Sequence, residues 1–156
     1  MPRQLPVTAV MSSPVTTLTP DTTVEEAVKT LVDAGISGAP VVDGDGRLVG
    51  LLDDTDLLVS EARLHAPTTI ELLGAYLPLP GERKRFEEEL RQALGGLVEQ
   101  VMEHDPPAVV PDATVEDVAT LLHDRGVSRV PVVDGRRAVV GIVTRGDLVK
   151  ALRRAE

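Results

Sequence analysis

Residues 11–58 and 102–149 of this 156-residue chain align with each other without a gap, and 19 of the 48 aligned pairs are identical. Nine of the other 29 pairs exchange one aliphatic residue for another. A unit this short exposes too much apolar surface to be stable alone, so the two copies are expected to bury a shared face. The duplication therefore predicts a pseudo-symmetric body with binding sites in the clefts between its halves. Positions that differ between the copies should indicate what binds.

Composition excludes several classes of protein. The chain has no cysteine, which rules out disulfides, thiolate metal sites and cysteine nucleophiles. Its net charge of −9 argues against a nucleic-acid binder that works through bulk electrostatics. The N-terminal residues show no secretory signal, and no apolar run reaches transmembrane length. We therefore expect a cytoplasmic protein with an aliphatic core and without a nucleic-acid or membrane partner.

Each copy carries the signals of a β-α-β-β-α unit. In copy one, a short extended segment precedes Thr23, whose spacing to Glu26 is that of a helix-capping pair. The helix is expected to end at Gly35, where a left-handed residue is least costly. Two β-branched runs joined by an Asp-Gly turn follow, and a second helix begins near Asp54. The matching positions of copy two are Thr114, Asp117, Gly126 and Arg145. This order predicts an α+β fold.

Two short motifs flank the hairpin of each copy. Before it stand Gly35-Ile36-Ser37-Gly38-Ala39-Pro40 and Gly126-Val127-Ser128-Arg129-Val130-Pro131, and after it stand Asp53-Asp54-Thr55-Asp56 and Thr144-Arg145-Gly146-Asp147. In this order, and occurring twice, the motifs resemble those of the CBS domain, named after cystathionine β-synthase, and the pair resembles a Bateman module. The resemblance implies two pseudo-symmetric repeats packed through their sheets. Repeat one would span residues 1–60, a helical insert 61–100 and repeat two 101–156.

Thr144, Arg145 and Asp147 have the clearest binding chemistry. They lie where a strand ends and a helix begins, so unpaired backbone N–H groups and the positive end of the helix face the cleft. The hydroxyl can donate to a phosphate oxygen, the guanidinium adds positive charge, and the carboxylate can accept from the two hydroxyls of a ribose. The alternative is purely structural, with Thr144 capping the helix and Asp147 completing the capping motif.

Copy one departs from this pattern, because Asp53 stands where copy two has Thr144. A carboxylate in that place repels a phosphate unless a cation intervenes. Residues 11–58 carry nine acids and two bases, whereas residues 102–149 carry eight acids and five bases. We therefore expect one competent site and one weaker site. The three acids of residues 53–56 have two other interpretations: a Mg²⁺ site, or acids that favour the helix dipole.

The resemblance further implies that each site draws on both repeats. The first site, expected to be the competent one, would consist of Thr144, Arg145, Asp147, Thr16, Ile36, Ser37, Ala39, Pro40 and Ile142. A nucleobase would lie there against the two isoleucines and nearby backbone. The second, weaker site would consist of Asp56, Val127, Ser128 and Arg129. Arg129 stands where some members of the family place a residue that contacts phosphate, and a solvated surface residue is the alternative.

The insert between the repeats is longer than a linker needs to be. A helix is predicted from about residue 82 to residue 94, because apolar residues recur on one face. An ordinary packed amphipathic helix is one interpretation, and a cap over the cleft or a dimer contact is another. Tyr76 stacking on a nucleobase is a further alternative.

The resemblance implies a regulatory module that binds an adenosine-containing nucleotide in the cleft between repeats and relays binding to an effector protein by a conformational change. AMP or ATP, with or without Mg²⁺, is the foremost ligand, ahead of S-adenosylmethionine and NAD. A homodimer is also implied. No residue is assigned as catalytic or as a metal ligand, so we do not expect an enzyme. The alternatives are a metal-dependent nucleotide-processing enzyme and an interaction module whose clefts bind nothing.

Overall fold

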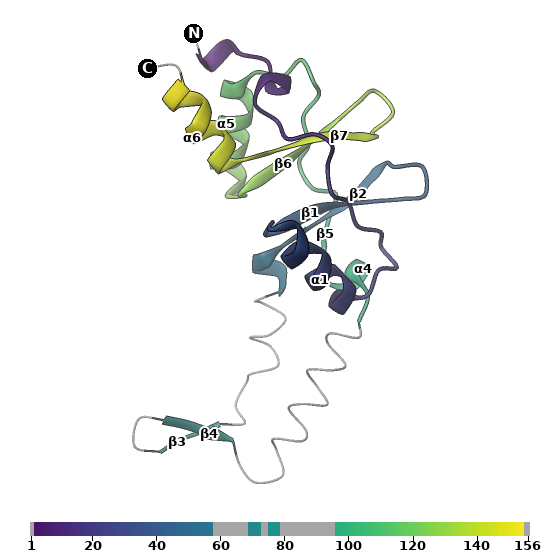
Figure 1. The fold of residues 1–156 in the computed structure, drawn as a ribbon, viewed down its shortest axis with the longest axis vertical. Helices are drawn as coiled ribbons and strands as arrows, with labels where there is room; N and C mark the ends of the chain where they lie inside the picture. Colours follow the sequence, from purple (N-terminus) through teal and green to yellow (C-terminus); the bar gives the residue numbers. More distant parts are fainter. Residues whose placement is uncertain (1, 58–68, 73–74, 79–95, 155–156) are drawn as a thin grey trace.

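The computed structural model describes residues 2–57, 69–72, 75–78 and 96–154. The two repeats form two similar α+β bodies, which lie one above the other in Figure 1. Each body contains an antiparallel hairpin and its own helices. The predicted α+β class and the duplication are therefore confirmed.

Repeat one is built as its capping and turn residues predict. Its elements are α1 (Val24–Ala34), β1 (Gly38–Val42) and β2 (Leu48–Asp53), and residues 54–57 begin a second helix. The hydroxyl of Thr23 accepts the backbone N–H of Glu26 at 3.1 Å, which caps α1. Gly35 ends the helix in the left-handed region at φ +65°. The extended segment predicted at the start of the repeat forms one parallel bridge, between Leu18 and Val41.

Repeat two has the same order and the same strand register. Its elements are α5 (Val115–Arg125), β6 (Arg129–Val133), β7 (Val139–Thr144) and α6 (Arg145–Arg154). Thr114 and Asp117 form the full capping box, because each side chain accepts the backbone N–H of the other residue. Val109 makes the parallel bridge to Val132 that corresponds to the bridge in repeat one. The agreement between two separately encoded copies shows that these local signals determine the elements.

The two hairpin turns meet at the pseudo-two-fold axis. Arg47 and Ala138, which occupy equivalent positions, form an antiparallel bridge. The N–H of Leu48 donates to the carbonyl of Arg137 at 2.9 Å, and the N–H of Val139 donates to the carbonyl of Gly46 at 3.1 Å. Backbone hydrogen bonds therefore join the two sheets at the hairpin ends, which holds the repeats in one relative orientation.

The segment that leads into each repeat packs on the other repeat. At the N-terminus, η1 (Pro2–Gln4) and η2 (Val7–Ala9) lie on repeat two, where Val7 is buried in the core and Ser12 bridges to Ile142 of β7. After the insert, α4 (Val98–Val101) and β5 (Glu103–His104) pack on repeat one, and β5 pairs with β2. A Cβ at Gly141 would meet Met11, and one at Gly50 would meet Met102. This exchange explains why both methionines and both glycines occur in the two copies.

The two cores are aliphatic, as a chain with one tyrosine and one phenylalanine requires. The core of repeat one contains Leu18, Ala27, Leu31, Ala39, Val41, Leu52, Val98 and Met102. The core of repeat two contains Val7, Val115, Val118, Leu122, Val130, Val132, Val143 and Leu148. Because each list includes a residue from an exchanged lead-in segment, neither repeat completes its core alone.

The insert contains an antiparallel hairpin that the sequence analysis did not predict. Its strands are β3 (Thr69–Leu72) and β4 (Ala75–Pro78). The helix predicted for residues 82–94 lies outside the described residues, and so does the side chain of Tyr76. Within the described ranges, no helix combines the length and apolar character that a membrane crossing requires.

Candidate functional site

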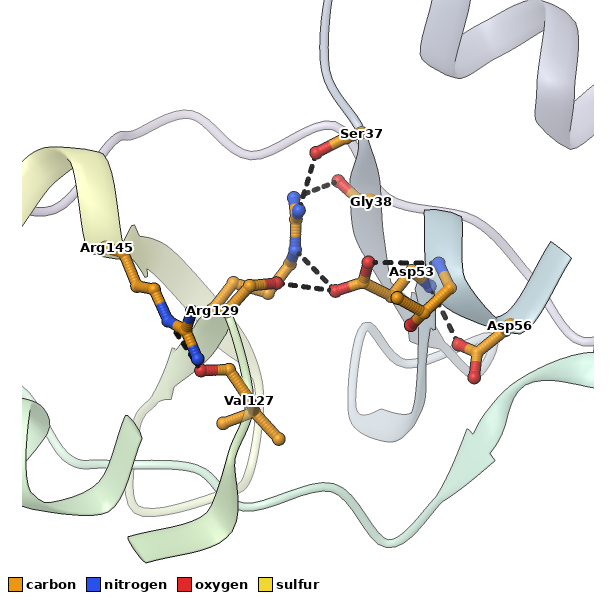
Figure 2. A network of polar contacts seen from close by, with 9 residues as sticks. Ser37, Gly38, Asp53, Asp56, Val127, Arg129 and Arg145 are labelled. Carbon is orange, nitrogen blue, oxygen red and sulfur yellow. Dashed lines mark hydrogen bonds and ion pairs between the residues drawn. The ribbon is translucent and has the colours of Figure 1, made fainter. Parts of the chain in front are cut away.

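Arg129 forms a buried polar network between the two repeats (Figure 2). Its Nε donates to Oδ2 of Asp53 at 3.1 Å, and its Nη2 donates to the hydroxyl of Ser37 at 2.6 Å. Its Nη1 donates to the carbonyl of Gly38 at 3.3 Å. Arg129 is only 7% exposed, so the interpretation of this residue as a solvated surface group is wrong. We call this group of residues the Arg129 clasp: Ser37, Gly38, Asp53, Ser128 and Arg129.

The clasp depends on two differences between the copies. Gly38 and Arg129 are equivalent positions, and so are Asp53 and Thr144. In the strand register, Gly38 lies opposite Asp53 on β2, and Arg129 lies opposite Thr144 on β7. A Cβ at Gly38 would lie 2.8 Å from Cζ of Arg129 and 2.7 Å from the carbonyl oxygen of Leu52. The absence of a side chain at 38 therefore lets the arginine of repeat two reach the aspartate of repeat one.

One carboxylate oxygen of Asp53 accepts two hydrogen bonds from repeat two. The hydroxyl of Ser128 donates to Oδ2 at 2.8 Å, and Nε of Arg129 donates to the same atom at 3.1 Å. Burial by itself raises the pKa of Asp53, but hydrogen bonds from Asp54 and Ser128 and the charge of Arg129 outweigh it and hold the pKa below 3.8. Asp53 is thus a paired carboxylate whose charge the site neutralises.

The other two acids of this segment do not complete a metal site. The N–H of Asp53 donates to Oδ2 of Asp56 at 2.9 Å, which caps the helix that follows. The pKa of Asp56 is raised, first by burial and then by the charges of Asp53 and Asp54, against the hydrogen bond from the N–H of Asp53. Within the part of the chain that the structure describes, no three His, Cys, Asp or Glu side chains are placed to hold a metal ion. The geometry of residues 53–56 therefore gives the Mg²⁺ interpretation no support.

Thr144 and Asp147 form the capping motif that was the structural alternative. The N–H of Thr144 donates to Oδ2 of Asp147 at 2.9 Å, and the hydroxyl oxygen of Thr144 accepts the N–H of Asp147 at 3.2 Å. These bonds use neither the hydroxyl proton of Thr144 nor Oδ1 of Asp147, and no described residue hydrogen bonds to that Oδ1. Arg145 is exposed, and its Nε donates to the carbonyl of Val127 at 3.3 Å. Capping and ligand binding are thus compatible in this segment.

Asp147 borders a cavity of about 450 Å³ between the N-terminal segment and α6. The cavity is lined by Leu5, Ala9, Val10, Met11, Asp147, Lys150, Ala151 and Arg154. Its volume lies in the range of small-molecule pockets, roughly 300–1,000 Å³. Asp147 is the one residue of the predicted first site that lines this cavity, so the cavity shows access to its carboxylate from the side of the N-terminal segment.

The structure distributes the other predicted residues of the first site between surface and core. Thr16 is exposed and Ile36 is 38% exposed, so both side chains can meet a ligand. Ala39 and Pro40 are fully buried in β1, so only their backbone could do so. Ile142 is partly buried and pairs with Ser12. The structure joins Ser37 to repeat two through Arg129 and gives no hydrogen bond between Ser37 and Thr144.

Two residues of the predicted second site, Ser128 and Arg129, contact Asp53 of repeat one, which was not among its predicted members. The hydrogen bond of Asp56 is to the N–H of Asp53 and not to Ser128 or Arg129. Sequence analysis missed the partnership of Asp53 with Arg129 and the part that Gly38 plays in it. The signal was present in the two paired differences: Gly38 against Arg129, and Asp53 against Thr144. One difference brings a buried cation, and the other brings the anion that neutralises it.

Fold and site together define a class of protein: a module of two duplicated α+β repeats that exchange their lead-in segments and meet at a polar clasp. A model of the CBS domain matches residues 7–62 and 98–154, which include both repeats. The chain therefore belongs to the CBS domain family.

Relatives with the same domain occur in archaea and plants. An uncharacterised protein of Methanocaldococcus jannaschii is 37% identical over 123 residues, which cover 75% of this chain and 73% of that protein. Two chloroplastic CBS domain-containing proteins of Arabidopsis thaliana are 36% and 32% identical over 85% of this chain. This chain spans 56% of the length of each of those two relatives.

Solved structures of CBS domain pairs share the fold. Arabidopsis thaliana CBSX2, in complex with AMP, has a TM-score of 0.72 and 27% identity, and the match covers 96% of this chain and 97% of that one. The CBS domain pair of protein MJ0100, in complex with 5′-methylthioadenosine and S-adenosyl-L-methionine, has a TM-score of 0.71 and 26% identity over 97% of this chain and 98% of that one. The chain is therefore a CBS domain pair.

Proposed function

We propose that this CBS domain pair is a regulatory module that binds a phosphorylated adenosine ligand at the first site. The observation that carries the proposal is the contrast between equivalent positions. In repeat one, the position before the second helix carries Asp53, an oxyanion held by a serine hydroxyl and a guanidinium. In repeat two, the equivalent position carries Thr144, which has no negative charge. An oxyanion at the first site would therefore come from a ligand, and a phosphate group has the required chemistry.

The phosphate would lie between Thr144 and Ser37. The hydroxyl of Thr144 and the positive end of the ten-residue helix α6 are groups of the kind that bind phosphate. The N–H groups of Arg145 and Asp147 already donate to Ser128 and Thr144, so the helix would contribute mainly through its dipole. Nη2 of Arg129, 2.6 Å from the hydroxyl of Ser37, brings positive charge to the same place, and exposed Arg145 adds more. The network thus supplies hydroxyl donors and two guanidinium groups for one anion.

The nucleoside would extend from the phosphate toward the carboxylate of Asp147. Oδ1 of Asp147 can accept from the 2′- and 3′-hydroxyls of ribose while Oδ2 keeps its bond to Thr144. A base would lie against the exposed side chain of Ile36, with Thr16, Ile142 and the backbone of residues 39–40 nearby. Backbone N–H and C=O groups can read the edge of adenine without charged side chains.

AMP and ATP are the foremost candidates because both have an adenosine and a phosphate. A relative of known structure is in complex with AMP, which supports this ligand class. The other solved pair is in complex with 5′-methylthioadenosine and S-adenosyl-L-methionine, which have no phosphate. Thermal unfolding with each of these compounds, ADP and NAD at millimolar concentration distinguishes them. AMP or ATP is expected to raise the Tm most, and no increase with any compound would support an interaction module instead.

Substitution of equivalent aspartates tests the location. Asp147→Asn keeps an amide oxygen that can cap the helix but removes the charge that binds a ribose. We expect this change to weaken AMP binding at least tenfold, a difference of about 1.4 kcal/mol in binding free energy. The control is Asp56→Asn at the equivalent position of the second site, which should change affinity much less. Equal losses in the two variants would contradict the assignment of the first site.

The same proposal includes a second copy of the chain on the α5–α6 face. A groove of about 480 Å³ there is lined by Ala119, Leu122, His123, Arg145, Leu148, Val149 and Leu152. Val149 is 64% exposed and Leu152 is 52% exposed, and a large apolar surface of this kind is typical of an interface. Sedimentation should show a dimer that Val149→Glu disrupts and Val110→Glu, at an exposed position outside the groove, does not. A wild-type monomer would contradict this part of the proposal.

Ligand binding would act on an effector protein by changing the relative orientation of the repeats or of two modules. Such a relay requires the ligand to bind the two arrangements unequally. Small-angle scattering with and without AMP is expected to differ, and identical curves would contradict the relay. A cytoplasmic location also stays a prediction, and two of the relatives are chloroplastic by name.

A further inference from the structure

We propose that Asp53 is an internal anion that occupies the phosphate position of the second site, so that the chain binds one phosphorylated ligand and not two. This inference rests on the proposed function for the meaning of the first site. It concerns a residue that lies outside the first site and that the clasp holds in place.

The evidence is the convergence of three donors on one carboxylate group. Ser128 donates to Oδ2 of Asp53 at 2.8 Å and Arg129 donates to it at 3.1 Å, while the N–H of Thr55 donates to Oδ1 at 3.4 Å. A hydroxyl, a guanidinium edge and a helix-start N–H are the groups that bind a phosphate in proteins. Here they bind a carboxylate of the same chain, which presents a negatively charged oxygen to the donors that a phosphate would use.

Pseudo-symmetry indicates that this place corresponds to the phosphate position of the first site. Ser128 is equivalent to Ser37, and Asp53 is equivalent to Thr144. The helix starts are also held alike, because the carbonyl of Ser37 accepts the N–H of Asp54 at 2.9 Å and that of Ser128 accepts the N–H of Arg145 at 3.1 Å. The two sites therefore share one framework and differ in whether the chain supplies the anion.

Burial makes the internal anion hard to displace. The side chains of Arg129 and Asp53 are 8% and 14% exposed, so the attraction between them is weakly screened by solvent. An incoming phosphate would have to separate this pair and would face the carboxylate at short range. A free ligand in solution competes poorly with a group that the fold already holds in contact.

The guanidinium of Arg129 donates hydrogen bonds to residues of both sites. Nε lies on Asp53 of the second site, whereas Nη2 lies on Ser37 of the first site. Because Asp53 accepts the single hydrogen of Nε, that edge of the guanidinium has no Nε donor to give to a second phosphate. The other end remains directed to the first site, which is consistent with one phosphorylated ligand per chain.

The test is isothermal titration calorimetry with AMP on the wild-type chain and on Asp53→Thr, which installs the residue type that repeat two has at this position. We expect one AMP per wild-type chain and two per variant chain, with the second affinity within about tenfold of the first. Asp33→Thr is the matched control, because it removes the same charge from an exposed position on α1 and should leave the stoichiometry at one. Two AMP per wild-type chain, or one per Asp53→Thr chain, would overturn the proposal.

A second readout uses inorganic phosphate alone and separates this inference from the proposed function. Phosphate is expected to raise the Tm of Asp53→Thr by several degrees more than that of the wild type or of Asp33→Thr. If the wild type binds no AMP while Asp53→Thr gains this response, the proposed function fails and the internal anion stands. If no variant responds to AMP or phosphate, both fail.

Asp53→Thr leaves the buried guanidinium without its carboxylate, so it can fold poorly. The combined variant Asp53→Thr with Arg129→Gly avoids this, because it removes both charges and gives the second site the residue types of the first at both positions. Because Nη2 of Arg129 also lies at the first site, the affinity of that site is expected to fall in the combined variant while the stoichiometry rises to two. Two AMP per chain supports the proposal, and one AMP per chain contradicts it.

Discussion

Replacing Arg129 with methionine is expected to lower the free energy of unfolding by about 3–5 kcal/mol, the usual cost of leaving one charge of a buried pair alone. The side chain of Asp53 is 14% exposed, so water cannot fully replace the lost guanidinium. The bonds of Arg129 to Asp53 and Ser37 are both charge-assisted. At about 1.5–3 kcal/mol each, their loss gives roughly 3–6 kcal/mol, which agrees with the first figure.

A double-mutant cycle separates the pair from the two residues. Asp53→Leu should also destabilise the chain, because it leaves the guanidinium buried without its carboxylate. The combined variant Asp53→Leu with Arg129→Met has no buried charge and should lie within about 1–2 kcal/mol of the wild type. The predicted coupling energy is therefore about 2 kcal/mol or more, at the upper end of what neighbouring residues show.

Urea unfolding followed by circular dichroism gives these free energies by linear extrapolation. Arg125→Met, on the exposed surface of α5, is the control and should change stability by less than about 0.5 kcal/mol. The reasoning would be refuted if the loss of unfolding free energy in the combined variant equalled the sum of the losses in the two single variants. It would also be refuted by a cost for Arg129→Met as small as that of the control.

Three further predictions concern the residues around the clasp and the caps. Gly38→Ala should cost about 1–3 kcal/mol by overpacking against Arg129 and the carbonyl of Leu52, whereas Gly135→Ala, with nothing within 4 Å of its added Cβ, should be nearly neutral in the same unfolding assay. The pKa of Asp53 is lowered in the folded chain, so the unfolded chain protonates this carboxyl first as the pH falls through 3.8. The free energy of unfolding of the wild type should therefore decrease below that pH. Asp53→Asn, which has no carboxyl at this position, should lose less stability over the same range. Thr114→Ala removes the hydroxyl that caps α5 and should cost about 1 kcal/mol, and an unchanged urea midpoint would contradict the capping role.

Local structure was predictable because each signal acts within a few residues and occurs twice. The cap at Thr23 and the left-handed end of the helix at Gly35 need only the neighbouring backbone, and the structure has both where the sequence places them. The hairpin turns follow the same rule, since Oδ1 of Asp43 accepts the N–H of Asp45 and of Arg47, and Asp134 repeats the arrangement in copy two.

The contacts between repeats were not predictable in the same way. Asp53 and Arg129 are 76 residues apart in the sequence, and each stands out only as a difference between the copies, with no local pattern that pairs the two. Their partnership depends on how the two bodies are oriented, which the exchanged lead-in segments and the joined hairpins determine. Met11 and Gly141 were visible as duplicated residues, but only the exchange explains why a methionine and a glycine occur together twice.

The first site was predictable in part: its location was, but its use was not. The segment of Thr144 and Asp147 was located correctly at a helix start, and the structure shows that it caps that helix. Whether it also binds a ligand depends on atoms that the cap leaves available, and sequence patterns do not distinguish between the two uses of the same residues.

A crystal structure of the chain grown with AMP tests the central claim most directly. The account predicts one AMP per chain, with its phosphate beside the hydroxyls of Thr144 and Ser37, its ribose hydroxyls on Asp147, and the bond between Asp53 and Arg129 intact. AMP bound instead with its phosphate on Ser128 and Arg129, with Asp53 turned away, would contradict the account.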